Sequence, residues 1–140
     1  MIPLSFAQQR LWFLYQLNGP SATYNVPTVL RLQGKVDESA LHAAVADLVA
    51  RHESLRTIFS DTDETPQQLV LSPDAACPIL HVQEVSENAF SEVLADATGY
   101  CFKLDREIPL RTWLFHLGDD QHVLLLLCHH IASDGWSWAP

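Results

Sequence analysis

Six consecutive apolar residues, VLLLLC at positions 123–128, leave few places in a folded protein for this part of the chain. A strand with one face in water alternates apolar and polar residues, whereas a strand covered on both faces is apolar at consecutive positions. The run is also far shorter than the ~20 residues that span a bilayer. We therefore predict a central strand over 121–128, in a sheet backed by helices.

The neighbouring segments supply the rest of an α/β sandwich. Pro109 precedes a strand over 111–117 that alternates, and the turn GDD at 118–120 makes it a hairpin with the apolar strand. Ser5 and Gln8 form a capping box for a helix over about 6–17, and Asp37 caps a helix whose apolar stripe runs from Leu41 to His52. The remaining predictions are strands over 26–32, 55–59, 67–71 and 79–85, and a helix from 86 to about 100.

Composition narrows the class of protein. The 140 residues suit one ordinary domain, and a hydrophobic content of 48% allows a core. The net charge of -9, with eight Lys plus Arg and no basic run, argues against a nucleic-acid surface. Cys77, Cys101 and Cys128 have no paired spacing, which predicts reduced thiols and a cytoplasmic protein without disulfides.

Two adjacent histidines and an acid follow the apolar strand directly, in the sequence HHIASDGWS at 129–137. Successive residues of a strand point to opposite faces, so His129 and His130 cannot both reach one cavity. One is expected to be functional and the other structural. Asp134 precedes Gly135, which permits a tight turn, so its carboxylate can fold back to hold the loop or meet a buried cation.

Other chemistries fit these residues less well. A zinc site would need a third ligand at short spacing, which Asp134 alone does not complete. Cys128 lies within the apolar run, where a thiol is usually inert. Ser133 and Ser137 lack the context of a nucleophile elbow. The remaining possibility is a histidine that acts on a proton at neutral pH, which suits direct transfer of an acyl group between carriers.

Arg51 and Arg56 lie where a helix gives way to a strand. Cations suit helix C-termini, so a solvated helix end explains them when they are considered alone. Arg56, however, falls at the start of a predicted strand, where a covered arginine needs an acidic partner. We therefore predict a salt bridge between Arg56 and Asp134.

Three segments together resemble the condensation domains of non-ribosomal peptide synthetases. SFAQQRLW at 5–12 is similar to the family's first motif, RHESLRTIF at 51–59 to its second, and HHIASDGWS at 129–137 to its third, the HHxxxDG signature. Their order and spacing also agree, and the resemblance covers all 140 residues. It implies the N-terminal lobe of a two-lobed domain built like chloramphenicol acetyltransferase, a mixed β-sheet covered by helices, with the C-terminal lobe absent.

The resemblance also implies a reaction and its residues. An aminoacyl or peptidyl thioester on an upstream carrier protein would be attacked by the amine of an aminoacyl thioester on a downstream one. His130 would orient or deprotonate the amine, with the Gly135 NH near the oxyanion. His129, Asp134 and Arg56 would be structural. No cofactor or metal would bind directly, because the partner carrier proteins bring the phosphopantetheine arms.

Two alternatives remain beside this one. The first is a coenzyme A-dependent acyltransferase of the same superfamily. The presence of the first two motifs argues against it. The second is a non-catalytic lobe that docks carrier proteins or an oxygenase. The presence of an intact His130 argues against this alternative. The 140-residue lobe alone is expected to be inactive, because half a tunnel cannot enclose two thioesters.

Overall fold

The apolar run lies in β7 (Gln121–His129), which is paired on both sides within the main sheet. The structure is a computed structural model that describes residues 2–62, 65–134 and 137. The sheet has the order β2-β7-β6-β5, in which β2 (Asn25–Gln33) and β6 (Leu110–Gly118) run antiparallel to β7. The edge strand β5 (Leu80–Glu84) is parallel to β6, so the sheet is mixed. The predicted central strand and hairpin are confirmed.

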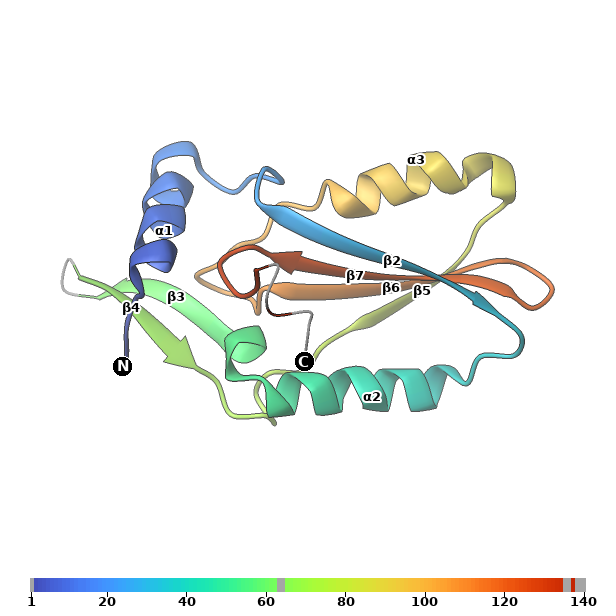
Figure 1. Ribbon diagram of the computed structural model, residues 1–140, viewed down its shortest axis with the longest axis horizontal. Coiled ribbons are helices and arrows are strands. Elements are labelled where there is room, and N and C mark those ends of the chain that lie inside the picture. Colours follow the sequence, from blue (N-terminus) through green and yellow to red (C-terminus); the bar gives the residue numbers. More distant parts are fainter. Residues whose placement is uncertain (1, 63–64, 135–136, 138–140) are drawn as a thin grey trace.

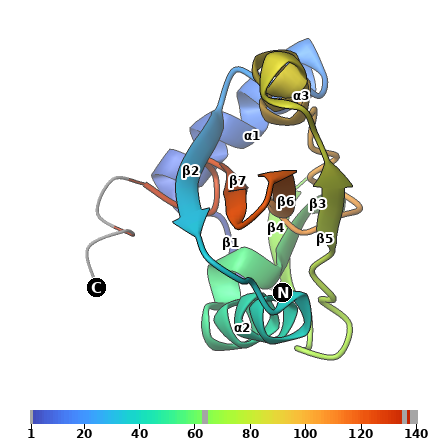
Figure 2. The ribbon, with the colours of Figure 1, turned by 90° about the vertical axis from the view of Figure 1, so that its right-hand side faces the viewer.

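Helices α2 (Glu38–Arg51) and α3 (Glu87–Thr98) cover opposite faces of this sheet (Figure 1). Figure 2 shows the strands between the two helices, with α3 above and α2 below. On the α2 face, Val45 and Val49 pack in one core with Leu110 and Cys128. A second and larger core fills the α3 face, where Leu125 and its neighbours are fully buried. Burial on both faces explains why β7 has no polar alternation.

A smaller antiparallel sheet, with the order β1-β4-β3, lies with α1 at one end of the molecule (Figure 1). Its strands are β1 (Ile2–Pro3), β3 (Thr57–Thr62) and β4 (Thr65–Val70), and α1 is Phe6–Asn18. Trp12 of α1 is buried against Phe59, and its Nε1 donates a 2.8 Å hydrogen bond to Asp61 Oδ1. The first helix is thereby fixed to the small sheet.

The cap of α1 has the predicted form. Ser5 Oγ accepts a hydrogen bond from the Gln8 N–H, and Gln8 Oε1 accepts one from the Ser5 N–H. Ser5→Ala removes one of these two bonds and is expected to lower the free energy of unfolding by ~1 kcal/mol. Urea denaturation checks this value. Ser86→Ala is the matched control, because Ser86 is the N-cap of α3 but makes no side-chain cap bond; an equal loss in both variants would contradict the capping argument.

Several element boundaries differ from the predictions. The strand predicted from 55 begins at Thr57, because residues Glu53–Arg56 form a 3-10 turn in which Thr57 Oγ1 donates to the Glu53 carbonyl. His52 does not continue the stripe of α2, since it is the extended C-cap residue. The short strand β1 was not predicted, as two residues carry no periodic pattern. Among the described residues, no helix is both long and apolar enough to cross a membrane.

Candidate active site at the end of β7

His129, the last residue of β7, is buried on the α3 side of the sheet, with 3% of its surface exposed. Its Nδ1 accepts a 3.2 Å hydrogen bond from the Ile131 N–H, which places the proton of the neutral ring on Nε2. The Phe102 ring meets the imidazole edge to face, and Tyr24 lies against it at a tilt. Burial, and secondarily the neighbouring His130, lowers the pKa of His129 to about 4. His129 is therefore a neutral packing residue at pH 7.

His130 lies one residue beyond the strand and is exposed. Its backbone N–H donates a 2.8 Å bond to the Tyr24 carbonyl, which ties the start of the loop to the segment before β2. His130 lines a hollow of about 380 Å³ between this loop and the first turns of α1. Ser5, Gln8 and Leu11 form the α1 side of that hollow. The first and third sequence motifs are thus brought together around His130.

Asp134 holds the loop that follows His130. One of its carboxylate oxygens, Oδ1, accepts hydrogen bonds from the Ser137 N–H at 3.0 Å and from Ser137 Oγ at 2.9 Å. The Asp134 N–H in turn donates to Ser137 Oγ at 3.1 Å. Of the two uses predicted for this carboxylate, the structure places it in the first, folded back onto its own loop. Gly135, the predicted oxyanion donor, lies outside the described residues.

The predicted Arg56–Asp134 salt bridge is wrong. Both residues are described, and the Arg56 guanidinium instead donates to the Leu71 carbonyl and pairs with Glu53 at 3.2 Å. The 3-10 turn explains the difference, because it sets Glu53 and Arg56 three residues apart on one turn. Arg56 therefore supports the junction between the turn and β4, and not the loop after His130.

Cys128 is buried beside the histidines, and burial raises the pKa of its thiol to about 11. The nearby Ser133 hydroxyl acts in the opposite direction, but it is outweighed by burial and does not reach hydrogen-bond geometry with the thiol. A thiol with this pKa stays protonated at neutral pH and is a poor nucleophile. Among the described residues, no three His, Cys, Asp or Glu side chains are arranged to hold a metal ion.

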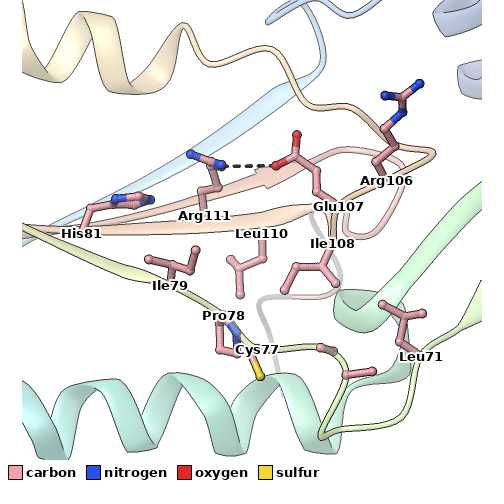
Figure 3. A pocket seen from close by; sticks show the side chains of 12 residues that line it. Leu71, Cys77, Pro78, Ile79, His81, Arg106, Glu107, Ile108, Leu110 and Arg111 are labelled. Carbon is pink, nitrogen blue, oxygen red and sulfur yellow. Dashed lines mark hydrogen bonds and ion pairs between the residues drawn. The ribbon is translucent and has the colours of Figure 1, made fainter.

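One further hollow adjoins this site, and a second shares Leu110 with the first. One of about 180 Å³ opens between the C-terminal end of α2 and the sheet, and is reached from Ser133 and Ser137 of the loop. The other, of about 240 Å³, lies beyond Leu110 at the edge of β5 (Figure 3). There, the Arg111 guanidinium pairs with Glu107 at 3.3 Å and stacks 3.9 Å from the centre of the Tyr100 ring. The sequence patterns gave no indication of either hollow, because side chains from distant segments line them.

The low pKa of His129 makes the folded chain sensitive to acid. An unfolded histidine binds a proton near its ordinary pKa of 6.5, whereas folded His129 does not do so until about pH 4. The contribution of neutral His129 is therefore fully present above pH 6.5 and is lost as the pH falls toward 4. We expect that loss to reach ~3 kcal/mol of unfolding free energy.

Urea denaturation at several pH values measures this loss. In His129→Asn, the fall in unfolding free energy between pH 6.5 and 4 should be smaller than in the wild type by that amount. His130→Asn, a change at the adjacent exposed position, should retain most of the wild-type fall, because burial is the larger cause of the lowered pKa of His129 and His130 the smaller. Parallel pH profiles for the wild type and His129→Asn would contradict the burial argument.

Comparison with known proteins agrees with this arrangement of fold and motifs. A family model of the condensation domain matches residues 1–139. The chain is 55% identical over 139 residues to a dimodular nonribosomal peptide synthase of Bacillus subtilis (strain 168). That match covers 99% of this chain and 6% of the synthase. It is 56% identical over 140 residues to a probable non-canonical nonribosomal peptide synthetase of Salinispora arenicola (strain CNS-205), covering 100% of this chain and 2% of that protein.

Solved structures give the same class of fold. The first condensation domain of the calcium-dependent antibiotic synthetase, in complex with a substrate analogue, superposes with a TM-score of 0.84 at 26% identity, over 96% of this chain and 34% of that one. The X-domain from teicoplanin biosynthesis, in complex with OxyB, superposes with a TM-score of 0.86 at 35% identity, over 96% of this chain and 29% of that one. The fold is thus that of the condensation domains and their relatives. This chain belongs to the condensation domain family, and it spans a small part of the relatives that it matches.

Proposed function

We propose that this chain supplies the catalytic histidine of an amide-forming condensation domain in non-ribosomal peptide synthesis. The observation that carries the proposal is the different setting of two adjacent histidines. His129 is buried and neutral, whereas His130 is exposed in a hollow formed with α1. The buried ring and the Asp134–Ser137 bonds hold the strand end and its loop, and leave the imidazole of His130 for substrate.

The proposed reaction joins two thioester-bound groups. The amine of the downstream aminoacyl group attacks the carbonyl carbon of the upstream thioester; a C–N bond forms and the C–S bond breaks. The electron pair of that bond leaves on the upstream sulfur, and the amine proton ends on the released thiol. The His130 imidazole orients the amine and accepts this proton in passing, while the Gly135 N–H stabilises the oxyanion.

The partners follow from this reaction. Both substrates would be carried on phosphopantetheine arms of peptidyl carrier proteins, in the cytoplasm, beside the other domains of a synthetase. Residues 1–140 would form the N-terminal of two lobes, with the second lobe enclosing the reacting groups. This division is supported by the 29% and 34% of the solved neighbours that the chain covers. The chain on its own would be inactive, since the His130 hollow lies between one loop and one helix.

The test is a single-turnover assay. The complete synthetase containing this chain is mixed with an upstream and a downstream carrier protein, each loaded with an aminoacyl group, and the dipeptidyl thioester is detected by mass. The expected result is a dipeptide on the downstream carrier and a free thiol on the upstream one. Absence of the dipeptide, with both carriers still loaded, would overturn the proposal.

Docking without chemistry is the second candidate. The X-domain of teicoplanin biosynthesis, which is 35% identical to this chain, has been solved in complex with OxyB. If this chain works in the same way, carrier or oxygenase binding should be measurable by titration while no dipeptide forms. The single-turnover assay therefore separates the two candidates.

A further inference from the structure

The hollow on the α2 side of the sheet adjoins the hollow of His130. The wall of this hollow of about 180 Å³ includes Leu55, Leu110 and Leu126, and Cys128 lies beside them. Ala132, Ser133 and Ser137 line both this hollow and the one that contains His130. Only the loop after β7 therefore separates the reacting groups from a small chamber with a mainly apolar lining.

Ser133 adds a buried hydroxyl to the wall of this chamber, which the polar residues His52, Ser54 and Ser137 also line. Ser133 is 8% exposed, and within the described part of the chain its buried Oγ has no hydrogen-bond partner. A buried hydroxyl without a partner lowers stability, because it loses its hydrogen bonds to water, and native structures usually satisfy such groups. An unsatisfied hydroxyl on the wall of a hollow next to the active histidine points to a ligand with a matching polar atom.

We propose that this chamber receives the side chain of one of the two aminoacyl groups, and that it selects an apolar side chain bearing one hydrogen-bonding group. The inference rests on the proposed function, because it names the substrate class of that same site. A cavity of ~150 Å³ holds a benzene molecule, so the chamber accommodates a side chain of up to about six heavy atoms. Ser133 Oγ then favours threonine over valine, which has the same shape without the hydroxyl.

Leu110 limits how far the side chain of the aminoacyl group reaches into the chamber. Its side chain lines both the chamber and the hollow of about 240 Å³ shown in Figure 3, so it forms the partition between the two. Truncating Leu110 joins them and lengthens the chamber toward Ile79 and Ile108. The structure thus assigns two separable properties: Ser133 selects for a polar atom, and Leu110 selects for length.

The experiment uses the complete synthetase with carrier proteins loaded chemically, so that only the condensation step selects. One carrier is supplied as a mixture loaded with threonine or valine, and in a second experiment with leucine or 2-aminooctanoate. Both experiments are then repeated with the other carrier. At one of the two carriers, wild type should prefer threonine by about fivefold, the effect of one hydrogen bond. Ser133→Ala should bring this ratio close to one.

Leu110→Ala should raise the use of 2-aminooctanoate relative to leucine by about tenfold, the effect of a methylene or two in an apolar pocket. Ile108→Ala is the matched control, because Ile108 lines only the second hollow and leaves the partition in place. Circular dichroism checks that the variants fold, and Leu110→Val replaces Leu110→Ala if the latter unfolds. The Ser133→Ala result is independent of that outcome.

Two failures are distinguishable. If the wild-type synthetase forms no dipeptide from any pair, the proposed function itself is wrong. If the wild type forms dipeptides but Ser133→Ala and the Leu110 variant keep wild-type ratios on both carriers, the chamber is not a side-chain subsite. The latter result is also expected if another part of the longer protein fills the chamber, so it overturns this inference alone.

Discussion

Replacing His130 with alanine is expected to slow dipeptidyl thioester formation by about two to four orders of magnitude, the usual contribution of a positioned general acid or base. The exposed His130 lines the α1 hollow, and histidine is the side-chain type most often used for proton transfer near neutral pH. Its removal leaves the fold intact, because the His130 side chain is exposed and its backbone bond to Tyr24 does not depend on it. Single-turnover kinetics in the complete synthetase measure the effect.

One further variant separates a proton-transfer role of His130 from positioning, and a second serves as a control. His130→Asn retains a hydrogen-bonding side chain but takes up no proton at neutral pH. Recovery of most of the rate in this variant would mean that His130 orients the amine. His42→Ala is the control for loss of an exposed histidine, since His42 lies on α2, where its ring bonds the Pro78 carbonyl. Wild-type rates in His130→Ala would show that the substrates react without this side chain.

Phe102→Ala is expected to lower the free energy of unfolding by ~3–5 kcal/mol, the usual cost of truncating a buried phenylalanine. Phe102 is 1% exposed and lies between Tyr100 and His129, with its ring edge to face with each. Its loss therefore leaves a cavity in the larger core and removes one wall around the buried imidazole. Urea denaturation of the chain gives the magnitude.

The control for this change is Phe13→Ala on α1, where the ring is 64% exposed. That substitution should alter the unfolding free energy of the chain by no more than ~0.5 kcal/mol. A similar loss in both variants would mean that the packing around His129 contributes nothing beyond general apolar content. A small loss in Phe102→Ala would mean that the core closes over the gap.

Local patterns were sufficient for most elements of this fold. The capping box at Ser5 and the N-cap at Asp37 set the starts of two helices, because a side chain a few residues away satisfies the free N–H groups. The VLLLLC run located the inner strand, because only a strand covered on both faces avoids polar alternation. The opposite orientation of adjacent strand residues agrees with the different burial of His129 and His130, while the division into a functional and a structural histidine stays a prediction.

The error at Arg56 shows where such patterns fail. The partner of a long, flexible cation depends on which carboxylate the folded backbone brings near, and a single 3-10 turn brought Glu53 in place of Asp134. The chamber beside Ser133 was missed for a related reason. Its walls come from α2, the 3-10 turn, both strands of the hairpin and the loop after β7, and no spacing in the sequence relates them.

The elements, the family and the histidine pair could be predicted from local patterns, because caps, strand alternation and contiguous motifs act over a few residues. The partner of Arg56, the neutral state of His129 and the hollows on either side of the loop follow from the packing of the folded chain. These depend on burial and on the distances between segments far apart in the chain, which exist only after the helices have packed on the sheet.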